Sequence, residues 1–135
     1  NYINKWNWYY DKGYARTHSK IDNKQLLYMH RLILNFPEDK DIDHINHNTL
    51  DNRKSNLRIV TSSQNSMNQR IRKDNTSGYK GVTWYKKNVK WGADIRINGE
   101  KIYLGLFDDK KQAALAYNKA ALEIHKEFSY LNMIQ

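Results

Sequence analysis

The sequence has no cysteine, a single proline and no long apolar stretch, and each shortage excludes a class of protein. Without cysteine, the chain cannot form disulfides, thiolate nucleophiles or cysteine-based zinc sites. A membrane-spanning helix needs about 18 or more consecutive apolar residues, and the sequence offers no such run. The chain opens at Asn1 without a methionine, which is compatible with a longer parent protein, and nothing typical of a signal peptide follows. We therefore expect a soluble protein of the cytoplasm that has no membrane partner.

Basic residues outnumber acidic ones, and this imbalance indicates the kind of partner. The 135 residues include 23 Lys and Arg against 14 Asp and Glu, a formal net charge of +9. Such a surface attracts polyanions. Charge alone would suit nucleic acid or an anionic membrane, and of these two we expect nucleic acid. The length leaves room for one ordinary domain or two very small ones, which excludes a large multi-domain enzyme.

A basic and polar run at residues 70–78 divides the chain into two parts. It has no apolar period, which is typical of a short linker that follows a helix. We place the domain boundary near Asp74, with one domain over residues 1–73 and a second over residues 74–135. Both parts carry a net positive charge, so both are suited to face one polyanion.

The first part begins with a predicted antiparallel meander. Aromatic runs at residues 6–10 and 14–18 flank an Asp-Lys-Gly turn, and residues 21–24 lead into a further strand at 25–29. The next stretch, residues 30–34, is compatible with a continued strand or with a short helix.

A strand, loop, strand and helix follow in the remainder of the first part. A short strand near Asp41 precedes a loop rich in Asn and Asp, and residues 57–60 form a second strand. The quartet after it fits a capping box, with Thr61 as N-cap and Gln64 at the third helical position. The pattern predicts a helix from residue 62 to about residue 72.

The second part alternates between apolar and polar residues in a way that predicts strands. Val82 and Trp84 indicate a first strand, residues 90–97 a second, and Asn98-Gly99 is the preferred two-residue hairpin turn. In the returning strand the inward residues are expected to be Ile102, Leu104 and Leu106. An Asp108 or Asp109 cap predicts a helix to about residue 126, with small alanines on its inward face. The expected class is α+β, with a three-stranded antiparallel sheet packed on one helix.

Four polar residues in the first part carry the groups needed to cut a phosphodiester. His44 is suited to act as a base that deprotonates water, and Asn56 is suited to orient its imidazole. Asp43 and Asn65 offer oxygen ligands to a hard divalent ion such as magnesium. Asn65 falls near the start of the predicted helix, where free amides also favour a phosphate.

The stretches around these residues match a known pattern over more than isolated positions. They are 30–33 (His-Arg-Leu-Ile), 43–46 (Asp-His-Ile-Asn), 51–58 (Asp-Asn-Arg-Lys-Ser-Asn-Leu-Arg) and 64–65 (Gln-Asn). Together they closely resemble the HNH endonucleases of phages and mobile introns, over roughly residues 6–73. The resemblance implies a β-β-α metal motif that clamps the minor groove and the scissile phosphate.

The same resemblance implies a role for each residue. His44 would be the general base, Asn56 its orienting partner, and Asp43 and Asn65 the metal ligands. One divalent ion is implied, with magnesium expected and manganese or another divalent ion as the alternative. The last position is Asn rather than the His that names the family, and a neutral amide is a weaker ligand.

A second group of residues predicts a surface that binds DNA. Cations, hydroxyls and an aromatic ring gather on or beside the outward face of the predicted sheet: Lys80, Thr83, Lys86, Lys87, Lys90, Arg96, Lys101 and Tyr103. A sheet of this size fits a major groove, where Arg and Lys contact bases or phosphates. We add Arg53 and Arg58 of the first part as further DNA contacts. The alternative interpretation is an ordinary solvated surface.

The second part also resembles a known DNA-binding domain. The matching stretches are 77–82, 91–96, 103–108 and 113–121, and they are similar to the DNA-binding domain of plant ethylene-response factors of the Apetala-two type. The similarity spans about residues 77–132. It implies that Lys80, Thr83, Arg96, Lys101 and Tyr103 face DNA. Several of these replace arginines and a tryptophan of that family, so its base preference does not carry over.

These patterns predict a homing-type endonuclease that hydrolyses phosphodiester bonds in double-stranded DNA. It would use one divalent metal ion and no small-molecule cofactor, and its C-terminal sheet would hold it on the target. We expect a monomer, with a dimer as the alternative, in a bacterial or phage-infected cell. The main alternative function is a non-catalytic DNA-binding regulator that retains the HNH scaffold. A third is an RNA or single-strand binder, suggested by the 13% aromatic content.

Overall fold

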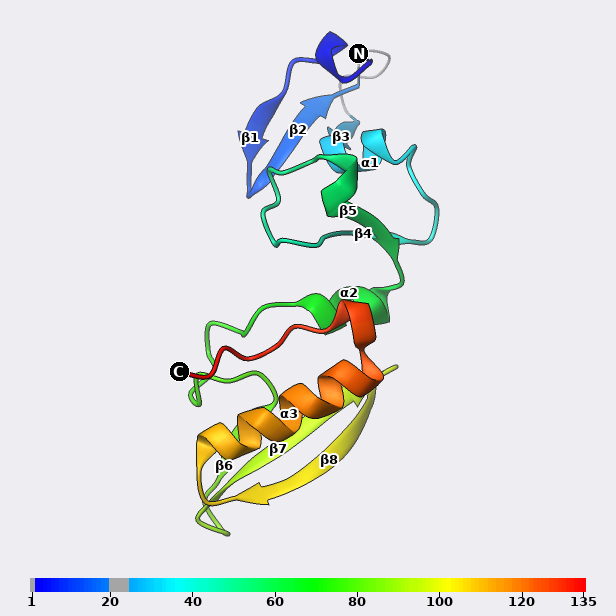
Figure 1. Ribbon diagram of the computed structural model, residues 1–135. Coiled ribbons are helices and arrows are strands. Elements are labelled where there is room, and N and C mark those ends of the chain that lie inside the picture. The colour runs from blue at the N-terminus through cyan, green and yellow to red at the C-terminus, as the bar shows by residue number, and fades with distance from the viewer. Residues whose placement is uncertain (1, 20–24) are drawn as a thin grey trace. The chain divides into compact units, whose positions relative to one another are not determined.

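Three antiparallel sheets organise the residues that the computed structural model describes, which are 2–19 and 25–135 (Figure 1). The chain divides into two units, residues 1–62 and 63–135. The expected α+β class is confirmed. The boundary expected near Asp74 falls inside the second of these units. No helix among the described residues is long and apolar enough to cross a membrane.

The first unit begins with the predicted meander. A 3₁₀ turn at Tyr2–Lys5 precedes strands β1 (Tyr9–Asp11), β2 (Tyr14–His18) and β3 (Leu26–Tyr28), which pair in the order β1-β2-β3. Lys12 and Gly13 both have positive φ values, of 47° and 91°, so they form the tight turn that joins β1 to β2. Residues 21–24, expected to lead into the third strand, lie outside the described residues.

A short helix and a two-stranded hairpin complete the first unit. Residues that fitted either a strand or a helix form helix α1 (Met29–Ile33). Strand β4 (Asp41–His44) pairs with β5 (Leu57–Val60), and a 3₁₀ turn at Lys54–Asn56 leads directly into β5. Of the polar residues singled out above, Asp43 and His44 lie on β4, Arg58 lies on β5, and Arg53 and Asn56 lie in the long loop between these strands.

Helix α2 (Ser62–Asn68) begins where the capping pattern predicts but ends earlier than predicted. The Lys80 ammonium donates to the carbonyl oxygens of Met67 and Gln69, at 2.7 Å each. These are carbonyls at and just beyond the last turn, which a continuing helix would use for its own hydrogen bonds. The long-range contact with Lys80 therefore accompanies the early end of the helix.

The second unit contains a three-stranded sheet covered by one helix (Figure 1). The strands are β6 (Val82–Tyr85), β7 (Lys90–Ile97) and β8 (Glu100–Phe107), in that order. Helix α3 (Lys110–Ile124) lies across one face, and a 3₁₀ turn at Lys126–Phe128 follows it. Asp109 caps α3 by accepting from Lys111 N at 3.0 Å, which confirms the predicted start.

Small side chains let α3 approach the sheet closely. The core joins sheet residues to the helix face and contains Val82, Ala93, Ile95, Ala113, Ala114, Tyr117, Ala120 and Ala121. Gly81 has a φ of 73°, and a Cβ there would overlap the Tyr117 ring. Glycine is therefore required at this position both for the backbone conformation and for the packing.

A β-bulge changes which residues of β8 face the core. Ala93 pairs with Gly105 whereas Asp94 pairs with Tyr103, so β8 contains one extra residue at that point. The alternation shifts by one residue beyond the bulge. Phe107 therefore packs against the core, whereas strict alternation predicts Leu106 there. That expectation was wrong, because a strict two-residue alternation takes no account of an inserted residue.

Candidate functional site

The β4–β5 hairpin places Asp43 and His44 at the end of β4. Asp43 faces Arg58 across the hairpin, and the chain turns directly after His44, where His47 N donates to His44 O at 2.9 Å. Asp43 is 8% exposed and His44 is 6% exposed. Because successive side chains of a strand point to opposite faces, we examine the partners of each separately.

The Asp43 carboxylate forms an ion pair with Arg58 of the neighbouring strand. Arg58 Nε and Nη2 both donate to Asp43 Oδ2, at 2.8 and 2.6 Å. The side chains are only 16% and 9% exposed, for Arg58 and Asp43 respectively. A charge removed from water requires such compensation, because the loss of hydration is costly. A guanidinium therefore already neutralises the carboxylate expected to bind a metal ion.

The His44 imidazole contacts one amide and two aromatic rings. Its Nε2 lies 3.1 Å from Asn52 Oδ1. The His30 ring meets it edge to face with centroids 5.2 Å apart, and the centroid of the Tyr14 ring lies at 6.4 Å. Ring packing and a hydrogen bond together restrict the imidazole to one orientation, which a group that must meet a substrate requires.

His30 stays neutral beside His44. It lies buried among the rings of Tyr14 and Tyr28, each with its centroid 5.5 Å away. Burial, followed by the charges of His44 and Arg31, lowers the pKa of His30 to about 4. An imidazolium formed at His44 near neutral pH would therefore meet no like charge at His30.

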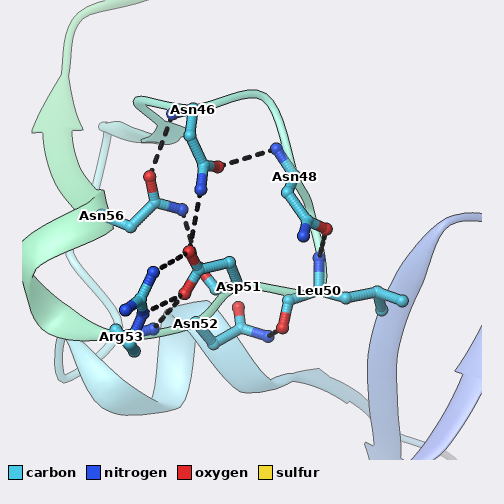
Figure 2. A network of polar contacts seen from close by, with 7 residues as sticks. All are labelled: Asn46, Asn48, Leu50, Asp51, Asn52, Arg53 and Asn56. Atoms are coloured by element: carbon cyan, nitrogen blue, oxygen red, sulfur yellow. Dashed lines mark hydrogen bonds and ion pairs between the residues drawn. The ribbon is translucent and has the colours of Figure 1, made fainter.

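Asn56 ties the two ends of the β4–β5 loop together (Figure 2). Its Oδ1 accepts from Asn46 N at 2.9 Å, and its Nδ2 donates to Asp51 O at 2.8 Å. The side chain is 6% exposed. Both ends of this buried amide are thus satisfied by the main chain, which holds the loop in one conformation.

An ion pair and a set of amides cross-link the remainder of the loop (Figure 2). Arg53 Nε and Nη2 donate to the two carboxylate oxygens of Asp51, at 2.7 Å each, and Asn46 Nδ2 donates to Asp51 Oδ2 at 2.8 Å. The bonds from Arg53 contribute most to holding the pKa of Asp51 well below its usual range. The loop is therefore shaped by its own polar side chains rather than by an apolar core.

The structure gathers three of the four predicted site residues in the first unit. Asp43, His44 and Asn56 all belong to the hairpin and its loop, whereas Asn65 lies on α2, in the second unit. Asn56 binds the main chain, and the amide that bonds the His44 ring belongs to Asn52. The sequence analysis did not single out Asn52, because an Asn in an Asn-rich loop is most simply explained as a turn residue.

The Asp43 carboxylate is compatible with a hard cation that takes its other ligands from water and phosphate. Across residues 2–19 and 25–135, no cluster of three or more His, Asp or Glu side chains could hold a metal ion. Asp43 offers carboxylate oxygens, and the other expected ligand, Asn65, offers one amide oxygen. Mg²⁺ commonly uses one or two carboxylates and takes its other ligands from water and phosphate. The Asp43 carboxylate therefore fits an ion of that kind.

The outward face of the β6–β8 sheet presents most of the residues expected to contact DNA. Arg96 pairs with Lys101 and Asp94 with Tyr103 across β7 and β8, on the face opposite the buried Ile95. The exposed residues among those predicted are Thr83, Lys86, Lys87, Arg96, Lys101 and Tyr103. Two cations have acidic partners: Lys101 Nζ lies 3.0 Å from Asp94, and Lys90 Nζ lies 2.7 Å from Asp108.

Lys80 contacts the chain itself. Besides its bonds to the carbonyls that follow α2, its ammonium lies 5.4 Å from the centroid of the Tyr130 ring. Burial lowers the pKa of Lys80 to about 8. Of the basic residues predicted in the first unit, Arg53 is 77% exposed and paired with Asp51, whereas Arg58 is the largely buried partner of Asp43.

Comparison with known proteins identifies related sequences for both parts of the chain. The family model described as HNH endonuclease matches residues 28–67, which include Asp43, His44, Asn56 and Asn65. A protein of Acanthamoeba polyphaga mimivirus named as an uncharacterized HNH endonuclease is 34% identical over 135 residues, covering 98% of this chain and 70% of the relative. Protein 3.8 of Escherichia phage T7 is 32% identical over 93 residues, covering 69% of this chain and 76% of the relative.

The C-terminal part has relatives among plant proteins. APETALA2-like protein 2 of Oryza sativa subsp. indica is 42% identical over 48 residues, which is 36% of this chain and 11% of the relative. The expected combination of an HNH part with an Apetala-two-like part is confirmed. None of the solved structures matches the chain to a significant degree.

Proposed function

Since the chain belongs to the HNH endonuclease family, we propose that it hydrolyses phosphodiester bonds in double-stranded DNA in a metal-dependent reaction. The observation that carries the proposal is the environment of His44. Its imidazole is held by an amide and two rings, directly after the buried carboxylate of Asp43. A fixed imidazole beside a potential metal ligand is the arrangement that general-base hydrolysis of a phosphate ester requires.

In this proposal His44 removes a proton from the attacking water. The transferred proton gives His44 a positive charge. Because His30 beside it is neutral, this charge is not repelled by a second positive charge there. Asp43 and Asn65 are the residues that would hold the divalent ion, with magnesium the expected one and manganese or another divalent ion the alternative. When bound, such an ion neutralises charge that develops on the phosphate and on the leaving oxygen. Asn56 contributes by holding the loop that follows His44.

The second unit would supply most of the DNA affinity. Arg96, Lys101 and Tyr103 lie exposed on its sheet. A relative of this part named as a dehydration-responsive element-binding protein supports a DNA-facing role for that surface. Phosphate contacts from cations provide affinity, whereas side chains that reach base edges provide selectivity.

We extend the proposal to a homing-type enzyme, because a small hydrolytic site has little sequence selectivity and gains it from an added groove-binding surface. We place it as a monomer in the cytoplasm of a bacterial or phage-infected cell.

Cleavage of a supercoiled plasmid tests this function. The wild-type protein is incubated with Mg²⁺ or with EDTA, and His44→Ala is compared with His18→Ala as a control. His18 is an exposed histidine of β2 whose ring stacks on Tyr9. We expect nicked or linear DNA only with the metal ion, loss of cleavage in His44→Ala and unchanged cleavage in His18→Ala. Duplex binding by His44→Ala should stay close to that of the wild type.

Two other outcomes would replace the proposal. Tight duplex binding without cleavage in any of several divalent ions would identify a non-catalytic DNA-binding regulator. The Asp43–Arg58 ion pair is the observation that favours this second function, because a guanidinium already occupies the carboxylate. A preference for RNA or single strands in competition binding would indicate the third function.

A further inference from the structure

The amide that contacts the His44 ring has its own orientation determined by the loop. Asn52 Nδ2 donates to Leu50 O at 3.3 Å (Figure 2). Only the nitrogen end of an amide can donate to a carbonyl, so this contact assigns which end is which. The oxygen end, Oδ1, is therefore the end that lies 3.1 Å from His44 Nε2.

This orientation has a chemical consequence for the imidazole. An amide oxygen only accepts hydrogen bonds, so His44 Nε2 must carry the hydrogen. In a neutral imidazole the other nitrogen, Nδ1, then holds the lone pair. Among the described residues, the buried side-chain atoms without a hydrogen-bond partner are Arg16 Nε and His125 Nδ1. His44 Nδ1 is not one of these atoms, so it is either accessible to solvent or hydrogen-bonded.

Asn56 is not available to hydrogen-bond the His44 imidazole. Its oxygen accepts from Asn46 N and its nitrogen donates to Asp51 O, at 2.9 and 2.8 Å. Turning the amide towards His44 would leave two main-chain groups of the loop without their partners. Asn52 and Asn56 therefore divide two tasks between them: one contacts the ring and the other holds the loop.

We propose that Asn52 is the positioning residue that holds His44 as the Nε2–H tautomer, so that Nδ1 is the basic nitrogen. The catalytic meaning of this inference rests on the proposed function. In the hydrolytic step, Nδ1 takes one proton from water as the water oxygen bonds to phosphorus. The bond from phosphorus to the leaving sugar oxygen breaks, and that oxygen takes a proton from solvent. The Asn52 oxygen remains bonded to Nε2–H throughout and stabilises the imidazolium that forms.

Nitrogen NMR of the wild-type protein tests the tautomer without any cleavage. The protein is labelled with ¹⁵N in histidine, and spectra are recorded well above the ordinary pKa of imidazole, with assignment by the His44→Ala spectrum. We expect a protonated Nε2, an unprotonated Nδ1 and an Nε2–H proton protected from exchange. A proton on Nδ1 of His44 would overturn the inference, whether or not the protein cleaves DNA.

Three variants test whether Asn52 is responsible. Asn52→Leu removes the acceptor at similar size, Asn52→Asp retains an acceptor, and Asn48→Ala changes the same loop at a residue whose side chain accepts from Leu50 N. We expect the protected Nε2–H signal to vanish in Asn52→Leu and to persist in the other two. A protected signal in Asn52→Leu equal to that of the wild type would overturn the assignment. If Asn52→Leu fails to fold, loss of the signal in folded Asn52→Asp overturns it.

Cleavage kinetics then test the catalytic part. We expect kcat of Asn52→Leu to fall about tenfold with KM nearly unchanged, since one hydrogen bond to the base is lost. Asn52→Asp should recover most of kcat, and Asn48→Ala should retain it. An equal fall in all three variants would show a purely structural contribution of the loop and overturn the positioning role. Absence of cleavage in the wild type would refute the proposed function while the NMR result still decides the tautomer.

Discussion

Arg58 places two donors on a single oxygen of Asp43, with Nη2 at 2.6 Å and Nε at 2.8 Å from Oδ2. This pair joins β4 to β5 at the residue before His44. Any cation that binds Asp43 must share the carboxylate with the guanidinium or displace it. The ion pair therefore links the stability of the hairpin to the metal affinity proposed for it.

Replacing Arg58 with Met should destabilise the protein and strengthen its response to divalent ions. The change leaves Asp43 buried without its counter-charge, for which a loss of about 3 kcal/mol in the free energy of unfolding is typical. Mg²⁺ should restore part of that loss and should stabilise the variant more than the wild type. Urea unfolding with and without Mg²⁺ measures both effects. Arg72→Gln is the control, because both side chains of the Arg72–Asp74 pair are exposed and the pair contributes little to the free energy of unfolding. Equal stabilities for the wild type and both variants would contradict the prediction.

His30 should make the protein less stable as the pH falls from about 6.5 to about 4. Its pKa is lowered from 6.5 to about 4 in the folded protein, so between these values the unfolded chain binds a proton that the folded chain does not. Folded stability is therefore lost as the pH falls through this window, by the order of 2 kcal/mol after allowance for solvent screening. The groups that face His30 are Tyr14, Tyr28, Arg31 and His44.

His30→Phe provides the comparison for that effect. Phenylalanine retains a ring in the cluster and removes the titrating group. The difference in unfolding free energy between the variant and the wild type should change with pH across this window and be constant above it. Other histidines contribute equally to both proteins, so they cancel in the difference. A difference that does not depend on pH would show that His30 titrates normally.

Lys80 and Arg96 should behave differently in DNA binding although both were expected to face DNA. Arg96 is exposed on the sheet, so Arg96→Ala should weaken binding and reduce the dependence of log K on log salt by about 1. The Lys80 ammonium binds the carbonyls of Met67 and Gln69. Lys80→Met should therefore lower thermal stability and leave the salt slope near that of the wild type. Titrations of a DNA duplex at several salt concentrations distinguish the two, and a reduced slope for Lys80→Met would assign this residue to the DNA contact.

Two glycines with similar backbone conformations should tolerate alanine differently. Gly81 and Gly78 have φ values of 73° and 80°, but a Cβ at Gly81 would overlap the Tyr117 ring whereas one at Gly78 meets no atom within 4 Å. Gly78→Ala should cost about 1 kcal/mol, from the backbone conformation alone. Gly81→Ala should cost about 3 kcal/mol, because overpacking is added. Urea unfolding followed by circular dichroism measures both, and equal losses would contradict the packing argument.

Local rules explain most of the secondary structure that could be predicted. The alternation in residues 90–97, the Asn98-Gly99 turn and the Asp109 cap each depend on neighbours a few positions away. Local rules do not distinguish strand from helix over residues 30–34, because a short apolar run fits both periods. The local pattern predicts a longer α2 than the structure has. The helix ends where Lys80, which is distant in the sequence, binds the carbonyl oxygens of Met67 and Gln69.

The spacing of Asp43, His44 and Asn56 by itself determined where a hydrolytic site should be sought, and the charge determined that its partner should be a polyanion. Residue types and intervals are properties of the chain alone. The tertiary structure decided which amide meets the His44 ring, that Arg58 neutralises Asp43 and that Lys80 turns inward. Such choices depend on the path of a loop and on burial. Several similar side chains compete there for each polar group, and only the folded chain selects among them.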